Sequence, residues 1–129
     1  MVAEGTIDAY EEDMNLEVGT EEAPMLKPAK VKIEKVEIQP IQDNKKVVCY
    51  VKHPEKEELI QISSLKFERN KKLEVAGTWI SKDSEGKIRK NSALAVLMEK
   101  LGAKTIKELE GKEADTIEDD KGYLCFKCY

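Results

Sequence analysis

Apolar and polar residues alternate with the period of a β-strand through much of residues 30–79. The phase of this alternation shifts between Ile33 and Val36, which a β-bulge would correct, and it shifts again at Ser63-Ser64. Residues that favour turns separate the runs at 40–44, 69–72 and 83–86. The pattern therefore predicts strands over residues 30–38, 47–51, 59–67 and 73–79.

The period changes to that of an α-helix after residue 92. Asn91 or Ser92 can cap the start of this helix, and Gly102 suits the left-handed residue that follows its end. Residues 105–108 fit a capping box that begins a short helical turn. The apolar residues with helical spacing are Ala93, Leu94, Leu97, Met98 and Leu101. Beyond them we expect a strand over 112–117, a hairpin loop over 118–122 and a strand over 123–129.

This order predicts a mainly β fold, an OB-fold-like β-barrel of five to six antiparallel strands with one principal helix before the last two strands. An OB-fold has its helix between the third and fourth strands, whereas four strands precede the helix here. Either the 30–38 strand is an addition, or two short strands form one bent strand. A two-layer α+β sandwich is the alternative architecture.

Charge divides the chain into two parts. Residues 1–26 contain eight acidic residues and no Lys or Arg, whereas residues 27–129 contain 22 basic and 18 acidic residues. We expect residues 1–28 to form a disordered acidic arm and residues 29–129 to form one small β-barrel domain, because like charges and few apolar residues do not support a core. The arm is a solubilising tail, a competitor of nucleic acid for the basic body, or a docking segment for a protein partner.

One stretch of the chain resembles a known group of proteins. Its motif residues are Gly77-Thr78-Trp79, Asp83, Gly86-Lys87-Ile88, Ser92-Ala93-Leu94-Ala95, Leu109-x-Gly111-Lys112 and Gly122-Tyr123-Leu124. Over residues 72–129 the chain resembles small OB-fold-like proteins of phages and archaea. Members of that group are often tied to binding of single-stranded DNA, so the resemblance implies the same ligand.

Basic residues near aromatic residues are the candidate binding site. Single-strand binders combine a cationic groove with aromatic side chains on which bases stack. The candidates are Lys66, Phe67, Arg69, Lys71, Lys72, Trp79, Lys82, Lys87, Arg89 and Lys90, with Tyr50 and Tyr123 as further aromatic residues. Two other interpretations stay open: Trp79 belongs to the core beside Leu73 and Val75, and the lysines are ordinary solvated turns or protection of a sheet edge.

The runner-up function is a protein-interaction module that uses a sheet edge or the acidic arm. We do not expect an enzyme, because the chain has a single histidine and neither a G-x-S-x-G motif nor a glycine-rich phosphate loop. That histidine, His53, precedes Pro54 and is expected to lie exposed in a turn.

Four residues could in principle bind zinc: Cys49, His53, Cys125 and Cys128. Positions 125 and 128 point to opposite faces of a strand, however, and a zinc-binding C-x2-C normally occupies a tight turn. We therefore expect no metal and no cofactor, with Cys128 in the core beside Leu124 and Phe126 and Cys125 on the other face. An internal disulfide is the remaining alternative.

Composition adds the cellular setting. No apolar run is long enough to cross a membrane, no secretory signal is recognisable, and three cysteines do not make a closed disulfide framework. We therefore expect a cytoplasmic protein with no membrane partner. Lys (20) and Glu (19) dominate over Asn (4) and Gln (3), a bias that is typical of thermophile proteins.

Overall fold

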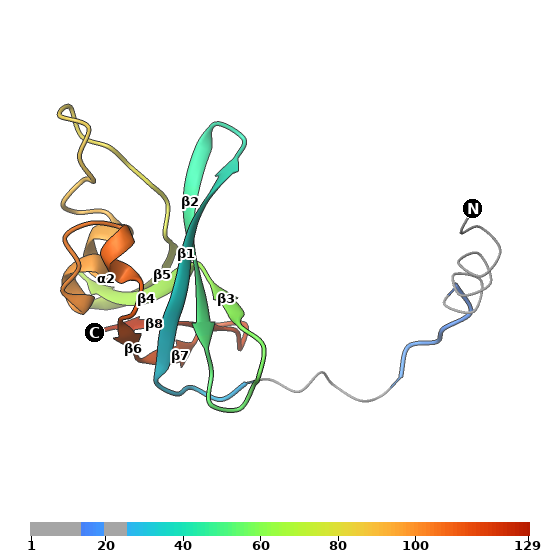
Figure 1. Ribbon diagram of the computed structural model, residues 1–129. Helices are drawn as coiled ribbons and strands as arrows, with labels where there is room; N and C mark the ends of the chain where they lie inside the picture. The colour runs from blue at the N-terminus through green and yellow to red at the C-terminus, as the bar shows by residue number, and fades with distance from the viewer. Residues whose placement is uncertain (1–13, 20–25) are drawn as a thin grey trace.

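The computed structural model describes residues 14–19 and 26–129, which are mainly β (Figure 1). The strands are β1 (Val31–Ile41), β2 (Asn44–Lys52), β3 (Ile60–Ile62), β4 (Ser64–Arg69), β5 (Lys72–Gly77), β6 (Glu113–Ala114), β7 (Thr116–Glu118) and β8 (Leu124–Cys128). Helix α2 (Ala93–Leu101) and a 3-10 helix (Lys107–Leu109) lie between β5 and β6. The prediction of a mainly β chain with one principal helix before the last strands is confirmed.

The strands form two four-stranded sheets. The first sheet has the order β3-β2-β1-β6 and is wholly antiparallel, and the second has the order β5-β4-β8-β7. The prediction of only antiparallel strands is wrong for one pair, because β4 and β8 run parallel. The connection between them includes α2, and only a long connection of this kind can bring the chain back in the same direction.

The first sheet curls into a half-barrel because its longest strand is bulged. The register of β1 against β2 shifts between Ile33 and Lys35, which confirms the predicted bulge. A bulge bends its strand and increases the local twist. Val31 and Ile33 are buried before the bulge, whereas the far end of the β1–β2 hairpin projects away from the body (Figure 1).

Two of the predicted strands each belong to both sheets. The 59–67 strand breaks at Ser63 into β3 and β4, and the 112–117 strand breaks at Asp115 into β6 and β7. The phase shift at Ser63-Ser64 therefore marks a corner rather than a bulge within one sheet. Because the two bent strands connect the sheets, six predicted strands become eight segments.

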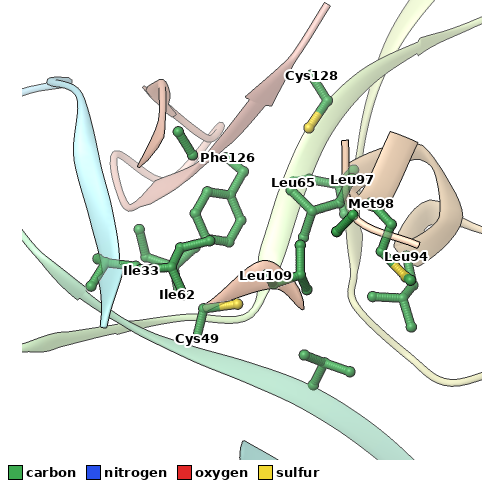
Figure 2. Close-up of a cluster of buried hydrophobic side chains, with 14 of the residues drawn as sticks. Ile33, Cys49, Ile62, Leu65, Leu94, Leu97, Met98, Leu109, Phe126 and Cys128 are labelled. Carbon is green, nitrogen blue, oxygen red and sulfur yellow. The ribbon is translucent and has the colours of Figure 1, made fainter. Parts of the chain in front are cut away.

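The core lies between the two sheets and α2. Figure 2 shows the Phe126 ring beside Ile33 and Ile62 of the first sheet, with Leu65 toward the helix. Leu94, Leu97 and Met98 of α2 are also buried in this core. The helix is held at both ends as predicted: the Ser92 hydroxyl accepts a hydrogen bond from the Ala95 N–H (3.2 Å), and Gly102 takes a left-handed φ of 73°.

His53 fastens the start of the body to β2. It is fully buried, so the expectation of an exposed turn histidine is wrong. Its Nδ1 accepts the Glu55 N–H (3.0 Å), which leaves Nε2 protonated to donate to the Lys27 carbonyl (2.8 Å). The predicted disordered arm falls largely outside the described residues, since 1–13 and 20–25 are not among them. Within the described part, residues 14–19 are all exposed, and nothing lies within 4 Å of a Cβ added at Gly19.

No helix in residues 14–19 or 26–129 is long and apolar enough to span a membrane.

Candidate nucleic-acid interface

The second sheet has one face on the core and one face toward solvent. Along β4, Leu65 and Phe67 point into the core, so Ser64, Lys66 and Glu68 point outward. Residues paired directly across strands share a face, which extends this surface to the neighbouring strands. We call it the outer face; it comprises Ser64, Lys66 and Glu68 of β4, Leu73, Val75 and Gly77 of β5, Cys125 and Lys127 of β8, and the adjoining Trp79.

The apolar residues of β5 lie on the outer face and are half exposed. Leu73 is 48% exposed and Val75 is 40% exposed. The sequence correctly placed Leu73, Val75, Gly77 and Trp79 on one side of the chain, but that side is turned toward solvent. The interpretation of Trp79 as a core residue packed with Leu73 and Val75 is therefore wrong.

Trp79 is a half-exposed ring held at the end of this face. It is 40% exposed and pairs with Lys46 in an isolated antiparallel bridge. The Lys46 ammonium lies 5.1 Å from the ring centroid, within range of a cation–π interaction. A Cβ at Gly77 would lie only 2.8 Å from Trp79 Nε1, so the ring rests directly on the glycine backbone. Glycine and lysine together fix the position of the indole.

Thr78 holds the chain segment that carries Trp79. It is fully buried, and its hydroxyl lies within hydrogen-bond distance of the Val47 carbonyl and of the Ser63 carbonyl (3.1 Å). The Thr78 N–H also donates to the Ser63 carbonyl (3.0 Å), while its carbonyl accepts the Val47 N–H (2.9 Å). These bonds join β2, the corner at Ser63 and the residue before Trp79 into one rigid unit.

The outer face, with its tryptophan, is the feature on which a function can be argued. No family model, curated protein or solved structure matches this chain. Chemically, the face offers an aromatic ring beside lysines, and every nucleobase has a π-face that such a ring can stack on.

The structure brings only part of the first predicted cluster to the outer face. Lys66 lies there, half buried and directly beside Lys127 of β8. Phe67 is only 2% exposed and packs in the core. The prediction that it binds nucleic acid is therefore wrong, because no base can stack on its ring. Arg69 and Lys72 pair with each other on the same side as Phe67, opposite to Lys66.

Arg69 and Lys71, the other members of this first cluster, are positioned by side-chain contacts and by a tight turn. Arg69 donates to the Asn91 carbonyl (3.3 Å), pairs with Glu74 (3.8 Å) and stacks over Phe67, so its guanidinium is engaged by the protein. Lys71 lies at the tip of the β4–β5 turn, where it and Asn70 have positive φ. A two-residue turn of this kind matches the twist of a hairpin.

The second predicted cluster lies on a hairpin of its own. Lys82 and Ile88 form a bridge, and the Asp83 N–H donates to the Lys87 carbonyl, so we call residues 82–88 the loop hairpin. Lys87 is exposed and lies 3.8 Å from Glu85. Arg89 and Lys90 are exposed beyond this hairpin, and the Arg69–Asn91 bond places their end of the loop next to the first cluster.

The four potential zinc ligands are not assembled. His53 uses both ring nitrogens in hydrogen bonds, and Cys49 lies in the core. Cys128 packs in the core with Phe126 beside Leu124, while Cys125 points to the other face, as the sequence indicated. Within residues 14–19 and 26–129, no group of three His, Cys, Asp or Glu side chains could hold a metal ion, and all three cysteines are free.

Cys125 shows that part of the outer face is shielded from solvent. The thiol is fully buried although it is on the solvent side of the sheet. Its pKa is raised to about 11, mainly by burial and also by nearby Asp119, while the positive charge of Lys66 lowers it. Lys66 therefore lies close to a covered thiol, over which its aliphatic stem can pack.

Three residues at this surface were not predicted from the sequence: Lys46, Lys127 and Tyr129. Lys46 reaches Trp79 only because residues 78–80 pair with the start of β2, and no local pattern reveals that pairing. Lys127 meets Lys66 only through the parallel β4–β8 pair, and its ammonium lies 5.1 Å from the centroid of the Tyr129 ring. The available signal was the alternation of Cys125, Lys127 and Tyr129 along the last strand.

Replacing Gly77 by alanine should displace the Trp79 ring with little loss of stability. The new methyl group would lie 2.8 Å from Nε1 and 3.0 Å from Lys46 Cε, and both are side-chain atoms that can move. We expect a red shift of Trp79 fluorescence and an unfolding midpoint close to wild type. Gly19→Ala, where nothing lies within 4 Å, is the matched control and should leave emission unchanged. Unaltered emission in Gly77→Ala would contradict this contact.

Proposed function

We propose that the protein is a non-enzymatic binder of single-stranded nucleic acid, most directly single-stranded DNA, and that the strand lies across the outer face. The observation that carries the proposal is the half-exposed Trp79 ring, fixed on the Gly77 backbone and beside the Lys46 ammonium. Stacking is indifferent to base identity, whereas the lysines would contact phosphates. Such binding would therefore be tolerant of sequence and sensitive to salt.

The strand order supports an OB-fold-like barrel. We count β3 and β4 as one bent strand, and β6 and β7 as another. The order of neighbouring strands is then β1, β2, β3/β4, β8 and β7/β6, and β6 closes the circle by pairing with β1. Five strands result, and α2 lies between the third and fourth of them along the chain, which is the OB-fold layout. β5 is then the strand added to the OB-fold layout, whereas the sequence had suggested the 30–38 strand as the addition. Partly open barrels of this kind bind oligonucleotides.

Charges along the face indicate a path for the strand. Lys46 lies beside Trp79 at one end of the face, Lys66 and Lys127 are neighbours across β4 and β8, and Tyr129 is 42% exposed beyond them. The half-exposed Val75 lies directly opposite Lys66 on β5. Bases would stack on Trp79 and cover the apolar side, while the backbone would follow the lysines.

Trp79→Ala should weaken binding of oligo-dT about 5- to 150-fold, the equivalent of about 1–3 kcal/mol for one stacked base. Trp79 is the only tryptophan, so oligo-dT should quench the fluorescence of the wild type, while the affinity of the variant is measured by anisotropy of a labelled oligonucleotide. Affinity should fall steeply with salt, and Lys66→Ala should reduce the slope of log K against log salt by about 1.

Lys72→Ala is the matched control, because Lys72 is on the opposite side of the same sheet. It removes the same charge and should leave affinity and salt slope much closer to wild type than Lys66→Ala does. Equal losses in the two variants would show that the outer face is not the site. Absence of binding to DNA or RNA at low salt, measured by anisotropy of a labelled oligonucleotide, would eliminate the proposal.

The second candidate is a protein-interaction module, and the free edge of β5 favours it. β5 is the last strand of its sheet. Every second backbone N–H of β5 points away from β4, and the N–H groups of Leu73 and Val75 are the ones that point to this free edge. A partner strand could add there and cover both side chains. Val75→Pro removes one edge amide while the bonds to β4 remain, so it should abolish strand addition but not binding of a nucleic acid to the lysines.

A further inference from the structure

An apolar groove lies on the helix side of the body, and the outer face does not include it. The groove has a volume of 730 Å³ and runs between the loop hairpin and α2. Its apolar lining comprises Ile88, Ala95, Met98, Ala103 and Ile106. Lys87, Lys104 and Glu99 contribute the charged part of the lining. The groove therefore offers an apolar floor between two lysines.

The acidic arm carries the apolar residues that have no place in the core. Met14 is 84% exposed, Leu16 is 76% exposed and Val18 is fully exposed. Residues 16–19 have no regular secondary structure. In an extended chain, Leu16 and Val18 point to the same side. Residues 11–18 contain four acidic residues and no basic residue. The segment is thus both acidic and apolar along one side.

We propose that the groove binds residues 14–18 of the acidic arm from a second copy of this chain. Charge supports the match, because the lining contains Lys87 and Lys104 against the single acid Glu99. The surrounding segment, residues 81–108, contains seven basic and four acidic residues. Acids on either side of the apolar segment would meet Lys87 and Lys104, and Leu16 and Val18 would cover Met98 and Ile106. Opposite charges of this kind also steer the encounter.

The reach of the arm selects a second copy. Leu26 lines a pocket together with the residues of β3, and Figure 1 shows β3 on one side of the body with α2 and the loop hairpin on the other. Val18 and Leu26 are eight residues apart in the sequence, which span at most about 29 Å. A body of this length has a radius of gyration of about 13 Å, and the path around half of it is longer than that span. Reciprocal exchange of arms gives a closed two-fold dimer.

Paramagnetic broadening between chains tests the proposal on the full-length protein. The three native thiols are buried, so Gly19→Cys supplies one selectively reactive site for a spin label. A spin-labelled chain at natural isotope abundance is mixed with an unlabelled chain carrying ¹³C-methyl isoleucine and methionine. We expect Ile88, Met98 and Ile106 to lose most of their intensity, and Ile38 and Ile41 of the β1–β2 hairpin to keep theirs.

Two variants separate the apolar and charged parts of the contact. Leu16→Ser/Val18→Ser keeps the charge of the arm and should abolish the broadening, and Lys104→Glu should weaken it strongly. Sedimentation should show a mass that rises with concentration in the wild type and not in the serine variant. No broadening between chains at millimolar concentration would overturn the proposal. Broadening seen only when label and isotope are on the same chain would also overturn it, by assigning the groove to the chain's own arm.

Discussion

Replacing Phe126 by alanine should lower the free energy of unfolding by about 3–5 kcal/mol. Phe126 is the largest fully buried side chain among the described residues, and Figure 2 shows its ring between the first sheet and the helix side of the core. Its neighbours Leu65 on β4 and Thr116 on β7 belong to the second sheet, and Ile33 and Ile62 of the first sheet lie beside the ring, so both sheets would border the cavity that the ring leaves. Rigid strands on both sides cannot collapse to fill it.

Urea unfolding at neutral pH measures this effect, and two variants give it a scale. Phe126→Leu keeps most of the apolar volume and should cost less than the alanine variant. Tyr129→Ala removes an aromatic ring that is 42% exposed on the neighbouring part of the chain, and it should change stability little. Equal costs for Phe126→Ala and Tyr129→Ala would contradict the packing of β8 in this core.

Raising the pH from 8 to 10 should destabilise the fold by roughly 4 kcal/mol through its three buried thiols. Burial raises the pKa of Cys49 from 9.0 to about 12, and burial is also the main reason that the pKa values of Cys125 and Cys128 rise to about 11. Because the folded state holds these protons more tightly than the unfolded state, the stabilisation is complete below about pH 9. It is lost progressively as the pH rises from about 9 toward the folded pKa values.

The contribution of one thiol can be isolated by comparing the loss of stability between pH 8 and pH 10 in a cysteine variant with the same loss in the wild type. Cys49→Ala should lower stability at every pH, but its loss between pH 8 and pH 10 should be smaller than that of the wild type by about 1.4 kcal/mol. Lysine and tyrosine ionisation is common to both proteins and cancels. Identical pH dependence in the two proteins would show that Cys49 ionises as freely in the fold as in the unfolded chain.

Local patterns in the sequence determined the elements of this protein. The phase shift between Ile33 and Val36 became the bulge of β1, and Ser92 and Gly102 became the caps of α2. These features depend on neighbours only a few residues away, and alternation or capping chemistry acts at that range. The same is true of Cys125 and Cys128, whose opposite directions follow from the pleat of one strand.

Only the tertiary structure decided which of these elements meet and which faces are covered. Leu73, Val75 and Trp79 were correctly placed on one side, yet the sequence could not say that α2 and the core cover the other side. Lys46 joins Trp79, and Lys127 joins Lys66, through pairings between segments more than 30 residues apart. Alternation separates the two faces of a strand but does not say which face is buried, because burial depends on segments that are distant in the sequence. Phe67 and His53 were misplaced for the same reason: each side chain is buried by distant segments that its local sequence does not reveal.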